Sequence, residues 1–379
     1  MSNRSLLGPA DVDDVELARM VADLLGHEPG EVHLLESTAE EFPYELPAIT
    51  TAGRFWVRGS ARTPSGDEHF RIFVKHVQSW SRSPLFEAVP EPFRASAEAQ
   101  VPWRTEPLVY RSGLRDLLPD GLHMPRSLGV VDLDDKSAAV WLEEVTTERP
   151  AWDLAGYSRA AYLLGRLAAS AAVASVDDVW ERDWRVRDYL DGRLGVQVLP
   201  LLRSDDVWQH PLVAGAFDDQ LRDRLLVAAD RAEAIVEELS AMPHLLSHGD
   251  ACPNNLLAGP EPDSFTLIDF GFWNPAPVGF DLGQLLVGDV QIGQRSPTLL
   301  APTESAIVPS YVEGLRAEAS QIPEDVVRRA HALHLLLFTG YSALPFDHLG
   351  SPITPELEQV ARDRAAVAAF SLDLLDATD

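Results

Sequence analysis

The feature that most constrains the fold of this chain is a pair of carboxylates with an amide between them. Asp250 is followed five residues later by Asn255, and a second carboxylate, Asp269, ends the β-rich run 265–268. A bare carboxylate at the end of an apolar strand is costly to bury, so Asp269 needs a counter-charge. We therefore expect these three side chains to converge around a cation.

These residue types suit the transfer of a phosphoryl group to a hydroxyl. Mg2+ prefers oxygen ligands, commonly one or two carboxylates together with phosphates and water, so Asn255 and Asp269 are the candidate ligands. Asp250 is the candidate base, or the acceptor that orients the attacking hydroxyl. Each residue alone could be an ordinary turn or capping residue, and the prediction rests on the joint pattern.

Length and charge narrow the class of protein. A chain of 379 residues with 46% hydrophobic residues is expected to be globular, with two lobes or domains. The formal net charge of -28 argues against binding to nucleic acid or to an anionic membrane surface. That charge could attract a cationic substrate, or it could simply keep the protein in solution.

A single cysteine, Cys252, excludes an internal disulfide and favours a reducing cytoplasm. The first residues lack the apolar core of a signal peptide, and the apolar runs fall short of a membrane span. A soluble cytoplasmic protein is therefore expected. Cys252 lies between Asp250 and Asn255, where we expect a small filling side chain rather than a nucleophile.

The order of elements predicts a β-rich front part and a helical back part. Strands are expected at 55–61 and 70–77, with a hairpin at 127–132 and 138–145. Residues 81–103 hold several prolines and no clear period, so an irregular loop is expected there. Helices are expected at 11–26, 104–118, 154–173, 221–240, 281–286 and 354–375.

Three motifs together resemble those of the aminoglycoside phosphotransferase and choline kinase superfamily. They are His248-Gly249-Asp250 with Asn255, Ile268-Asp269-Phe270-Gly271, and Phe280-Asp281-Leu282-Gly283. These proteins are small-molecule kinases with a protein-kinase-like fold, so the resemblance implies an α+β bilobal architecture. A small antiparallel β-sheet would form the N-lobe, and a mostly helical C-lobe would follow.

The resemblance also assigns roles. It makes Asp250 the catalytic aspartate and Asn255 and Asp269 the metal ligands, while Asp281 and His248 would brace the catalytic loop. Mg2+ would act with ATP or GTP as the co-substrate. The implied organisation is an N-terminal helical segment at 1–29, a nucleotide-binding N-lobe at 30–147 and a C-lobe at 148–379.

The front lobe should carry a lysine that contacts the nucleotide phosphates. The chain has only two lysines, and Lys75 lies in the predicted strand 70–77. Its orienting partner is expected to be Glu106, with Glu98 as the rival. Glu144 and Val145 resemble the connector whose backbone pairs with the nucleotide base.

One departure from kinases is plain, because no G-x-G sequence occurs anywhere in the chain. The expected substitute for the glycine-rich phosphate loop is 50–54, in which Gly53 is the only glycine. The absence leaves open weak nucleotide affinity, another phosphoryl donor, or a catalytically weak or inactive kinase-like protein that binds a nucleotide or metabolite.

Two features favour a small acceptor over a protein. Gly249 stands where protein kinases keep an arginine, and only eleven residues separate Asp269 from Asp281, too few for a long activation segment. The acceptor is expected to be a hydroxyl of an aminoglycoside, sugar or amino alcohol, and it could be cationic. Asp289, Glu304 and Asp347 could face such a cation or simply lie in solvent.

The sequence leaves the role of Trp273 open. Trp273 could stack on a substrate ring or lie in the core. A hydrolase is disfavoured, because the chain has neither a G-x-S-x-G elbow nor an H-E-x-x-H zinc helix.

Overall fold

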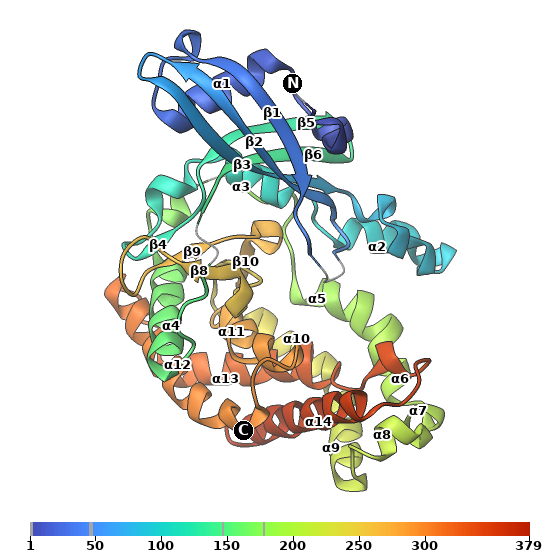
Figure 1. Ribbon diagram of the computed structural model, residues 1–379. Coiled ribbons are helices and arrows are strands. Elements are labelled where there is room, and N and C mark those ends of the chain that lie inside the picture. Colours follow the sequence, from blue (N-terminus) through green and yellow to red (C-terminus); the bar gives the residue numbers. More distant parts are fainter. Residues whose placement is uncertain (1–2, 45–47, 146–147, 177–178) are drawn as a thin grey trace.

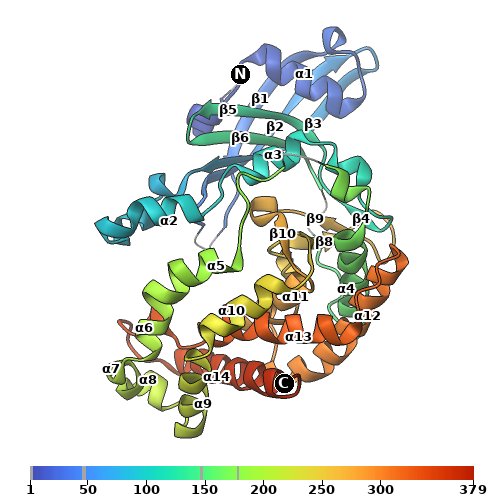
Figure 2. The same ribbon diagram turned by 180° about the vertical axis from the view of Figure 1, so that it is seen from behind.

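The computed structural model describes residues 3–44, 48–145, 148–176 and 179–379. A five-stranded antiparallel sheet lies at one end of the molecule, and helices make up most of the other end (Figures 1 and 2). The strand order is β1-β2-β3-β6-β5. The strands are β1 His33–Glu41, β2 Thr51–Thr63, β3 Gly66–Gln78, β5 Ser127–Asp134 and β6 Ser137–Glu143. The expected α+β fold, with a small antiparallel sheet followed by helices, is confirmed.

The two faces of the sheet have different partners. On one face, Val57, Ile72 and Val74 form a core with the helix α1 (Asp14–Leu25). This helix begins at the N-cap Asp13 and ends at Gly26 in the left-handed conformation, as the sequence predicts. Side chains alternate along a strand, so the opposite face carries Lys75 and its neighbours towards the helical part.

The segment between β3 and β5 corrects two expectations. Residues 81–103 form three short 3-10 turns and the helix α2 (Arg94–Gln100) rather than an irregular loop. Prolines at the starts of two of these turns preset the backbone, which is why no long period is visible in the sequence. The helix expected at 104–118 ends at Arg111 as α3 (Thr105–Arg111), and a 3-10 turn (Leu114–Leu117) follows it.

The C-terminal part is mostly helical. The longer helices are α4 Leu154–Ala169, α9 Asp219–Ala229, α10 Ala232–Ala241, α11 Phe280–Gln291, α12 Leu300–Ala317, α13 Glu324–Leu335 and α14 Pro355–Asp376. The shorter ones are α5 Val186–Tyr189, α6 Leu199–Leu202, α7 Asp205–Gln209 and α8 Pro211–Ala214. α4 and α12 cross so closely that a Cβ at Gly165 would lie 2.1 Å from the carbonyl oxygen of Tyr311.

One predicted helix is wrong in detail, since 221–240 contains two helices, α9 and α10. A turn at Asp230 and Arg231 separates them. Buried residues keep the helical period across that turn, so the sequence pattern does not reveal the break. They are Leu225, Ala228, Ala232, Ile235 and Leu239.

Short strands frame the segment that carries the candidate carboxylates. They are β4 Leu122–His123, β7 His244–Ser247, β8 Leu256–Ala258, β9 Phe265–Leu267 and β10 Asn274–Pro277. β9 lies between β4 and β8, and β10 pairs with β7.

No helix within the described parts of the chain is both long and apolar enough to cross a bilayer. The predicted boundary after residue 147 falls at 146–147, outside the described residues. The division into 1–29, 30–147 and 148–379 stays a prediction.

Candidate active site

The loop that carries Asp250 depends on a glycine. Gly249 has φ +81°, and a Cβ at that position would lie 2.1 Å from the carbonyl oxygen of Phe272. Only glycine combines this left-handed backbone with so close an approach. The constraint sets the direction in which the chain leaves β7 and presents Asp250.

Asp281, at the start of α11, anchors the same loop. Its two carboxylate oxygens accept the backbone N–H groups of His248 and Gly249, each at 2.9 Å. Burial raises the pKa of Asp281 to about 6, and these two hydrogen bonds oppose that rise. Asp281 therefore holds the loop through two hydrogen bonds to the backbone.

His248 links the loop to the strand that precedes Asp269. Its ring accepts the backbone N–H of Asp250 at Nδ1 (3.3 Å), which leaves Nε2–H to donate to the carbonyl oxygen of Ile268 (3.0 Å). The side chain is fully buried, and burial lowers its pKa to about 4. His248 is thus neutral at pH 7 and bridges the two acidic segments.

Asn255 is fixed between the same two segments. Its Nδ2 donates to the backbone oxygen of Asp250 (2.9 Å) and to the Oδ2 atom of Asp250 (3.0 Å). Its own backbone oxygen accepts the N–H of Ile268 at 3.1 Å, next to Asp269. This orientation leaves Oδ1 of Asn255 available as a neutral oxygen ligand.

Asp250 is suited to accept a proton near neutral pH. Burial raises its pKa to about 7, the charge of Asp269 adds to the rise, and the hydrogen bond from Asn255 opposes it. A general base works best with a pKa near the working pH.

Lys75 joins the sheet to Asp269. Its Nζ lies 2.9 Å from Oδ1 of Asp269 and 2.6 Å from Oε2 of Glu106 on α3. Burial alone would lower the pKa of Lys75, but the charges of Asp269 and Glu106 outweigh burial and raise it. Burial would likewise raise the pKa of Asp269, and Lys75 reverses that effect, so both groups are charged.

The rival partner of Lys75 lies elsewhere. Glu98 accepts hydrogen bonds from Lys136 (2.7 Å) and from two serines near β3. Lys136 is the main reason that the pKa of Glu98 falls to about 2. Of the two glutamates, the structure pairs Glu106 with Lys75.

Asp269 has an unusual backbone that matches its position. Its φ is 64°, a left-handed conformation that is uncommon outside glycine and that clusters at functional sites. Its side chain contacts Lys75 and is still 37% exposed to solvent. The carboxylate can therefore contact both the lysine and a ligand.

Asn255 and Asp269 carry oxygen atoms of the kind that suits a magnesium ion shared with phosphates. No group of three or more His, Cys, Asp or Glu side chains in the described chain forms a metal site of its own. Mg2+ is commonly held by one or two carboxylates and completes its shell with phosphates and water. Asn255 and Asp269 are therefore the candidate ligands for an ion bound in this way.

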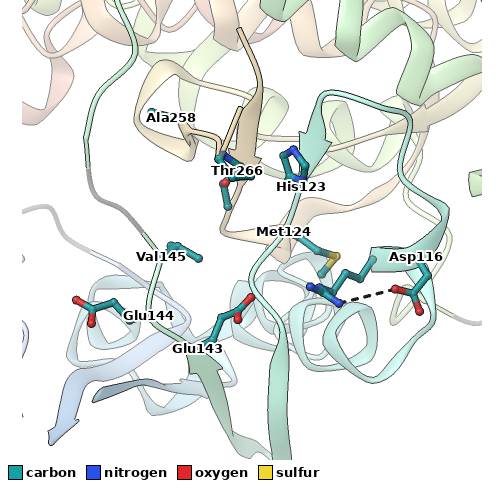
Figure 3. A pocket seen from close by; sticks show the side chains of 10 residues that line it. Asp116, His123, Met124, Glu143, Glu144, Val145, Ala258 and Thr266 are labelled. Carbon is teal, nitrogen blue, oxygen red and sulfur yellow. Dashed lines mark ion pairs between the residues drawn. The ribbon is translucent and has the colours of Figure 1, made fainter. Parts of the chain in front are cut away.

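The connector residues lie apart from this cluster. Glu144 and Val145 border a pocket of about 550 Å3 between β6 and the β4-β9-β8 sheet (Figure 3). Glu144 also forms an ion pair with Arg71 of β3. The other lining residues are Arg115, Asp116, His123, Met124, Glu143, Ala258, Pro260 and Thr266. The pocket therefore adjoins the connector, and none of the carboxylates of the cluster lines it.

Two residues near the cluster belong to the packing. Trp273 is fully buried, and its ring lies 6.0 Å from that of Phe270, so it is core rather than a stacking surface. Cys252 is partly buried, and burial raises its pKa to about 12, which keeps its thiol protonated.

The acids considered for a cationic acceptor have arginine partners. Asp289 pairs with Arg149 at 2.9 Å, and Asp347 pairs with Arg364 at 2.6 Å. Glu304 is buried and lies 3.3 Å from Arg328. These contacts neutralise the three acids and give none of them a free charge for a substrate.

Sequence reasoning missed two residues beside Lys75. Arg54 lies directly across from Lys75 in the β2-β3 pair, and its guanidinium lies 4.0 Å from the centre of the Tyr44 ring. The sequence predicts 50–54 as the substitute for a phosphate loop, but it points to Gly53 rather than to Arg54. Strand alternation could have indicated that Arg54 shares a face with Lys75.

Part of the chain matches a known protein family. Residues 138–306 match the model of the phosphotransferase enzyme family. No curated protein matches the chain at a significant level of sequence similarity.

Solved structures resemble the chain over most of its length. An aminoglycoside phosphotransferase from Alicyclobacillus acidocaldarius is 16% identical in sequence and has a TM-score of 0.52. The aligned region covers 89% of this chain and 91% of the phosphotransferase chain. A choline kinase from Cryptosporidium parvum is 11% identical, with 96% and 97% coverage and a TM-score of 0.47. An amicoumacin kinase is 12% identical, with 90% and 89% coverage and a TM-score of 0.48. The first of these shows a shared fold. The match to the phosphotransferase enzyme family bears out the resemblance to the aminoglycoside phosphotransferase and choline kinase superfamily and the prediction of a small-molecule kinase.

Proposed function

We propose that this protein transfers the terminal phosphoryl group of ATP or GTP to a hydroxyl of a small acceptor, with Mg2+ as cofactor. The observation that carries the proposal is the convergence of Asp250, Asn255 and Asp269 beside the buried Lys75. Phosphoryl transfer needs positioning and charge stabilisation more than covalent chemistry from the protein, and this set of side chains supplies both.

Asp250 is proposed as the base. The acceptor oxygen forms a bond to the terminal phosphorus as the bond to the nucleoside diphosphate breaks, and the hydroxyl proton passes to Asp250. The raised pKa of Asp250, about 7, leaves a substantial fraction of the carboxylate ionised at neutral pH and makes it basic enough to take this proton. Its hydrogen bond from Asn255 fixes the direction of the carboxylate.

Asp269 and the Oδ1 atom of Asn255 are proposed to hold Mg2+, which neutralises charge on the phosphates when it is bound. Lys75 is proposed to contact the phosphates, with Glu106 orienting its ammonium group. His248 and Asp281 touch no reacting atom in this scheme. They keep the backbone of the Asp250 loop in place.

Residues 30–147 are proposed as the nucleotide-binding lobe and 148–379 as the lobe that holds the catalytic loop. The backbone of Glu144 and Val145, at the connector between them, is the proposed contact for the nucleotide base. Nucleotide as co-substrate, together with a single protonated thiol at Cys252, suits a cytoplasmic location.

The acceptor is proposed to be an aminoglycoside, a sugar or an amino alcohol. Support comes from the short interval between Asp269 and Asp281, which leaves little chain to hold a peptide. The net charge of -28 favours a cationic member of this set through long-range attraction.

A second candidate is a kinase-like protein that binds nucleotide without turnover, and the missing G-x-G sequence favours it. Both candidates predict nucleotide binding, but only the first predicts a phosphorylated product.

The deciding experiment is an acceptor screen with the full chain. Aminoglycosides, sugars and amino alcohols are incubated with the protein, Mg2+ and either ATP or GTP, and products are read by the mass gain of one phosphate. A product that depends on acceptor and protein, and that is lost in Asp250→Ala, supports the proposal. Nucleotide binding without any phosphorylated acceptor across the panel would favour the second candidate.

A further inference from the structure

The missing glycine-rich loop raises the question of which groups grip the nucleotide phosphates. In kinases with that loop, backbone N–H groups approach the phosphates closely, because glycine adds no side chain. Here the only glycine of 50–54 is Gly53, and a Cβ there would meet the ring of Phe55 at 2.6 Å. Gly53 therefore relieves crowding within its own strand and is not explained by a phosphate.

Neighbouring segments on both sides of β2 fix the backbone of Arg54. Arg54 lies directly opposite Lys75 in the antiparallel β2-β3 pair, and its carbonyl oxygen accepts the N–H of Phe42 at 2.8 Å. Directly opposed residues in antiparallel strands point to the same face, with their Cβ atoms about 5 Å apart. The side chain of Arg54 therefore leaves the sheet on the face that presents Lys75 to Asp269.

The guanidinium of Arg54 is held by an aromatic ring rather than by an acid. It lies 4.0 Å from the centre of the Tyr44 ring. Among the residues that the structure describes, Arg54 forms no ion pair, whereas Arg58, four residues along the same strand, pairs with Glu40 at 2.9 Å. A cation–π contact orients a guanidinium and leaves its N–H donors free.

The position of Arg54 places its charge next to the candidate site. Its direct strand partner, Lys75, lies 2.9 Å from the carboxylate of Asp269. Lys75 is already engaged by two carboxylates, Glu106 and Asp269. Arg54 is thus a cation directly across from Lys75, and among the described residues no carboxylate lies within ion-pair distance of its guanidinium.

We propose that Arg54 binds the phosphates of the nucleotide and that Tyr44 positions its guanidinium. Arg54 would then supply the phosphate contacts that a glycine-rich loop makes in other kinases. The inference rests on the proposed function, since it concerns the same nucleotide. A guanidinium can donate two parallel hydrogen bonds to one phosphate, a geometry that a single ammonium cannot reproduce. One side chain can therefore stand in for several backbone donors.

The test compares the binding of ATP, ADP and adenosine by calorimetry, with the full chain and Mg2+. Charge-assisted hydrogen bonds of this kind predict that Arg54→Gln weakens ATP binding by about 10- to 100-fold. Adenosine affinity should change by less than about twofold, because adenosine carries no phosphate. Tyr44→Leu should weaken ATP binding by about two- to fivefold, the value of a solvent-accessible cation–π contact.

Arg58→Gln is the matched control, because it removes the same charge from the same strand and should leave all three affinities unchanged. Retained adenosine binding shows that Arg54→Gln is folded. Equal ATP affinity in wild type and Arg54→Gln, or an equal loss for ATP and adenosine, overturns the role of Arg54. If the wild-type protein binds neither ATP nor GTP, the proposed function fails and this inference fails with it. If the wild-type protein phosphorylates an acceptor but Arg54→Gln binds ATP normally, the proposed function stands and only the role of Arg54 is wrong.

Discussion

Replacing Asp250 with asparagine is expected to abolish turnover and yet stabilise the fold at alkaline pH. The substitution keeps an oxygen that can accept the hydrogen bond from Asn255 and removes a carboxylate whose ionisation the folded state resists. Burial, with the charge of Asp269 next, raises the pKa of Asp250 from 3.8 to about 7. A catalytic base contributes about 10²- to 10⁴-fold to the rate, so turnover should fall by at least that factor.

The size of the stabilisation follows from that pKa. One pKa unit corresponds to about 1.4 kcal/mol, so ionising Asp250 costs about 4 kcal/mol more in the folded than in the unfolded chain. Asp250 keeps partial contact with solvent, which reduces the expected gain for Asp250→Asn to about 2 kcal/mol at pH 8. The pKa of Asp250 is higher in the folded state than in the unfolded state. The contribution of Asp250 to the free energy of unfolding is therefore fully present below pH 3.8 and is lost as the pH rises through 7. The advantage of the variant should therefore shrink steadily from pH 8 to pH 5.

The assay is urea unfolding followed by tryptophan fluorescence, at pH 8 and pH 5, without nucleotide. Asp206→Asn is the matched control, an exposed aspartate on α7 whose replacement should change stability by less than about 0.5 kcal/mol at either pH. A variant that is less stable than wild type at pH 8 would show that the folded state does not resist ionisation of Asp250. So would a gain of the same size at both pH values.

Three further predictions concern the same cluster. The value of kcat/KM should fall about tenfold per unit below pH 7 as Asp250 is protonated, and a rate that is constant between pH 5 and pH 8 would contradict its role as base. Lys75→Met should destabilise the fold by about 3 to 5 kcal/mol, because it leaves two carboxylates without their cation. Adding Glu106→Gln should restore part of that stability in urea unfolding but no turnover, and unchanged stability in Lys75→Met would argue against a tight ion pair. Gly249→Ala should lower the unfolding temperature more than Gly279→Ala, because both glycines have φ +81° but only Gly249 would press its Cβ against a carbonyl oxygen, at 2.1 Å against 3.5 Å for the nearest atom at Gly279. Equal losses for the two alanine variants would show that strain alone, and not the contact with Phe272, makes Gly249 necessary.

The sequence was most informative where local chemistry decides the structure. The strands 55–61 and 70–77 were predictable because β-formers alternate around a turn that contains Gly66. The start of α14 was predictable because Thr354 caps it, accepting the N–H of Leu357 at 3.3 Å, and Pro355 fits its first turn. In both cases a few adjacent residues carry the whole signal.

Other features depend on contacts between distant segments and were out of reach. The break between α9 and α10 leaves the hydrophobic period intact, so no local pattern marks it. The choice between Glu106 and Glu98 needed the fold, since Lys136 engages Glu98 from 38 residues away. The motif residues His248, Asp250 and Asp281 could be named from the sequence, but the hydrogen bonds that connect them could not.

Arg54 shows a third kind of limit. Its partner in the β2-β3 pair follows from strand register, and the register was available in principle from the turn at 63–67. Its contact with Tyr44 depends on how the chain returns from β1 to β2, which no sequence pattern fixes. The proposed role of Arg54 depends on its position opposite Lys75, its contact with Tyr44 and the lack of a G-x-G sequence.

In the proposed mechanism, Asp269 and Asn255 hold a divalent cation against nucleotide phosphates beside Asp250. Titration of Mn2+ into the protein with a non-hydrolysable ATP analogue, followed by electron paramagnetic resonance, tests this arrangement. Wild type should bind Mn2+ in a nucleotide-dependent manner, Asp269→Asn should lower that affinity by at least about tenfold, and the surface variant Asp347→Asn should not. Equal Mn2+ affinity in wild type and Asp269→Asn would contradict the account.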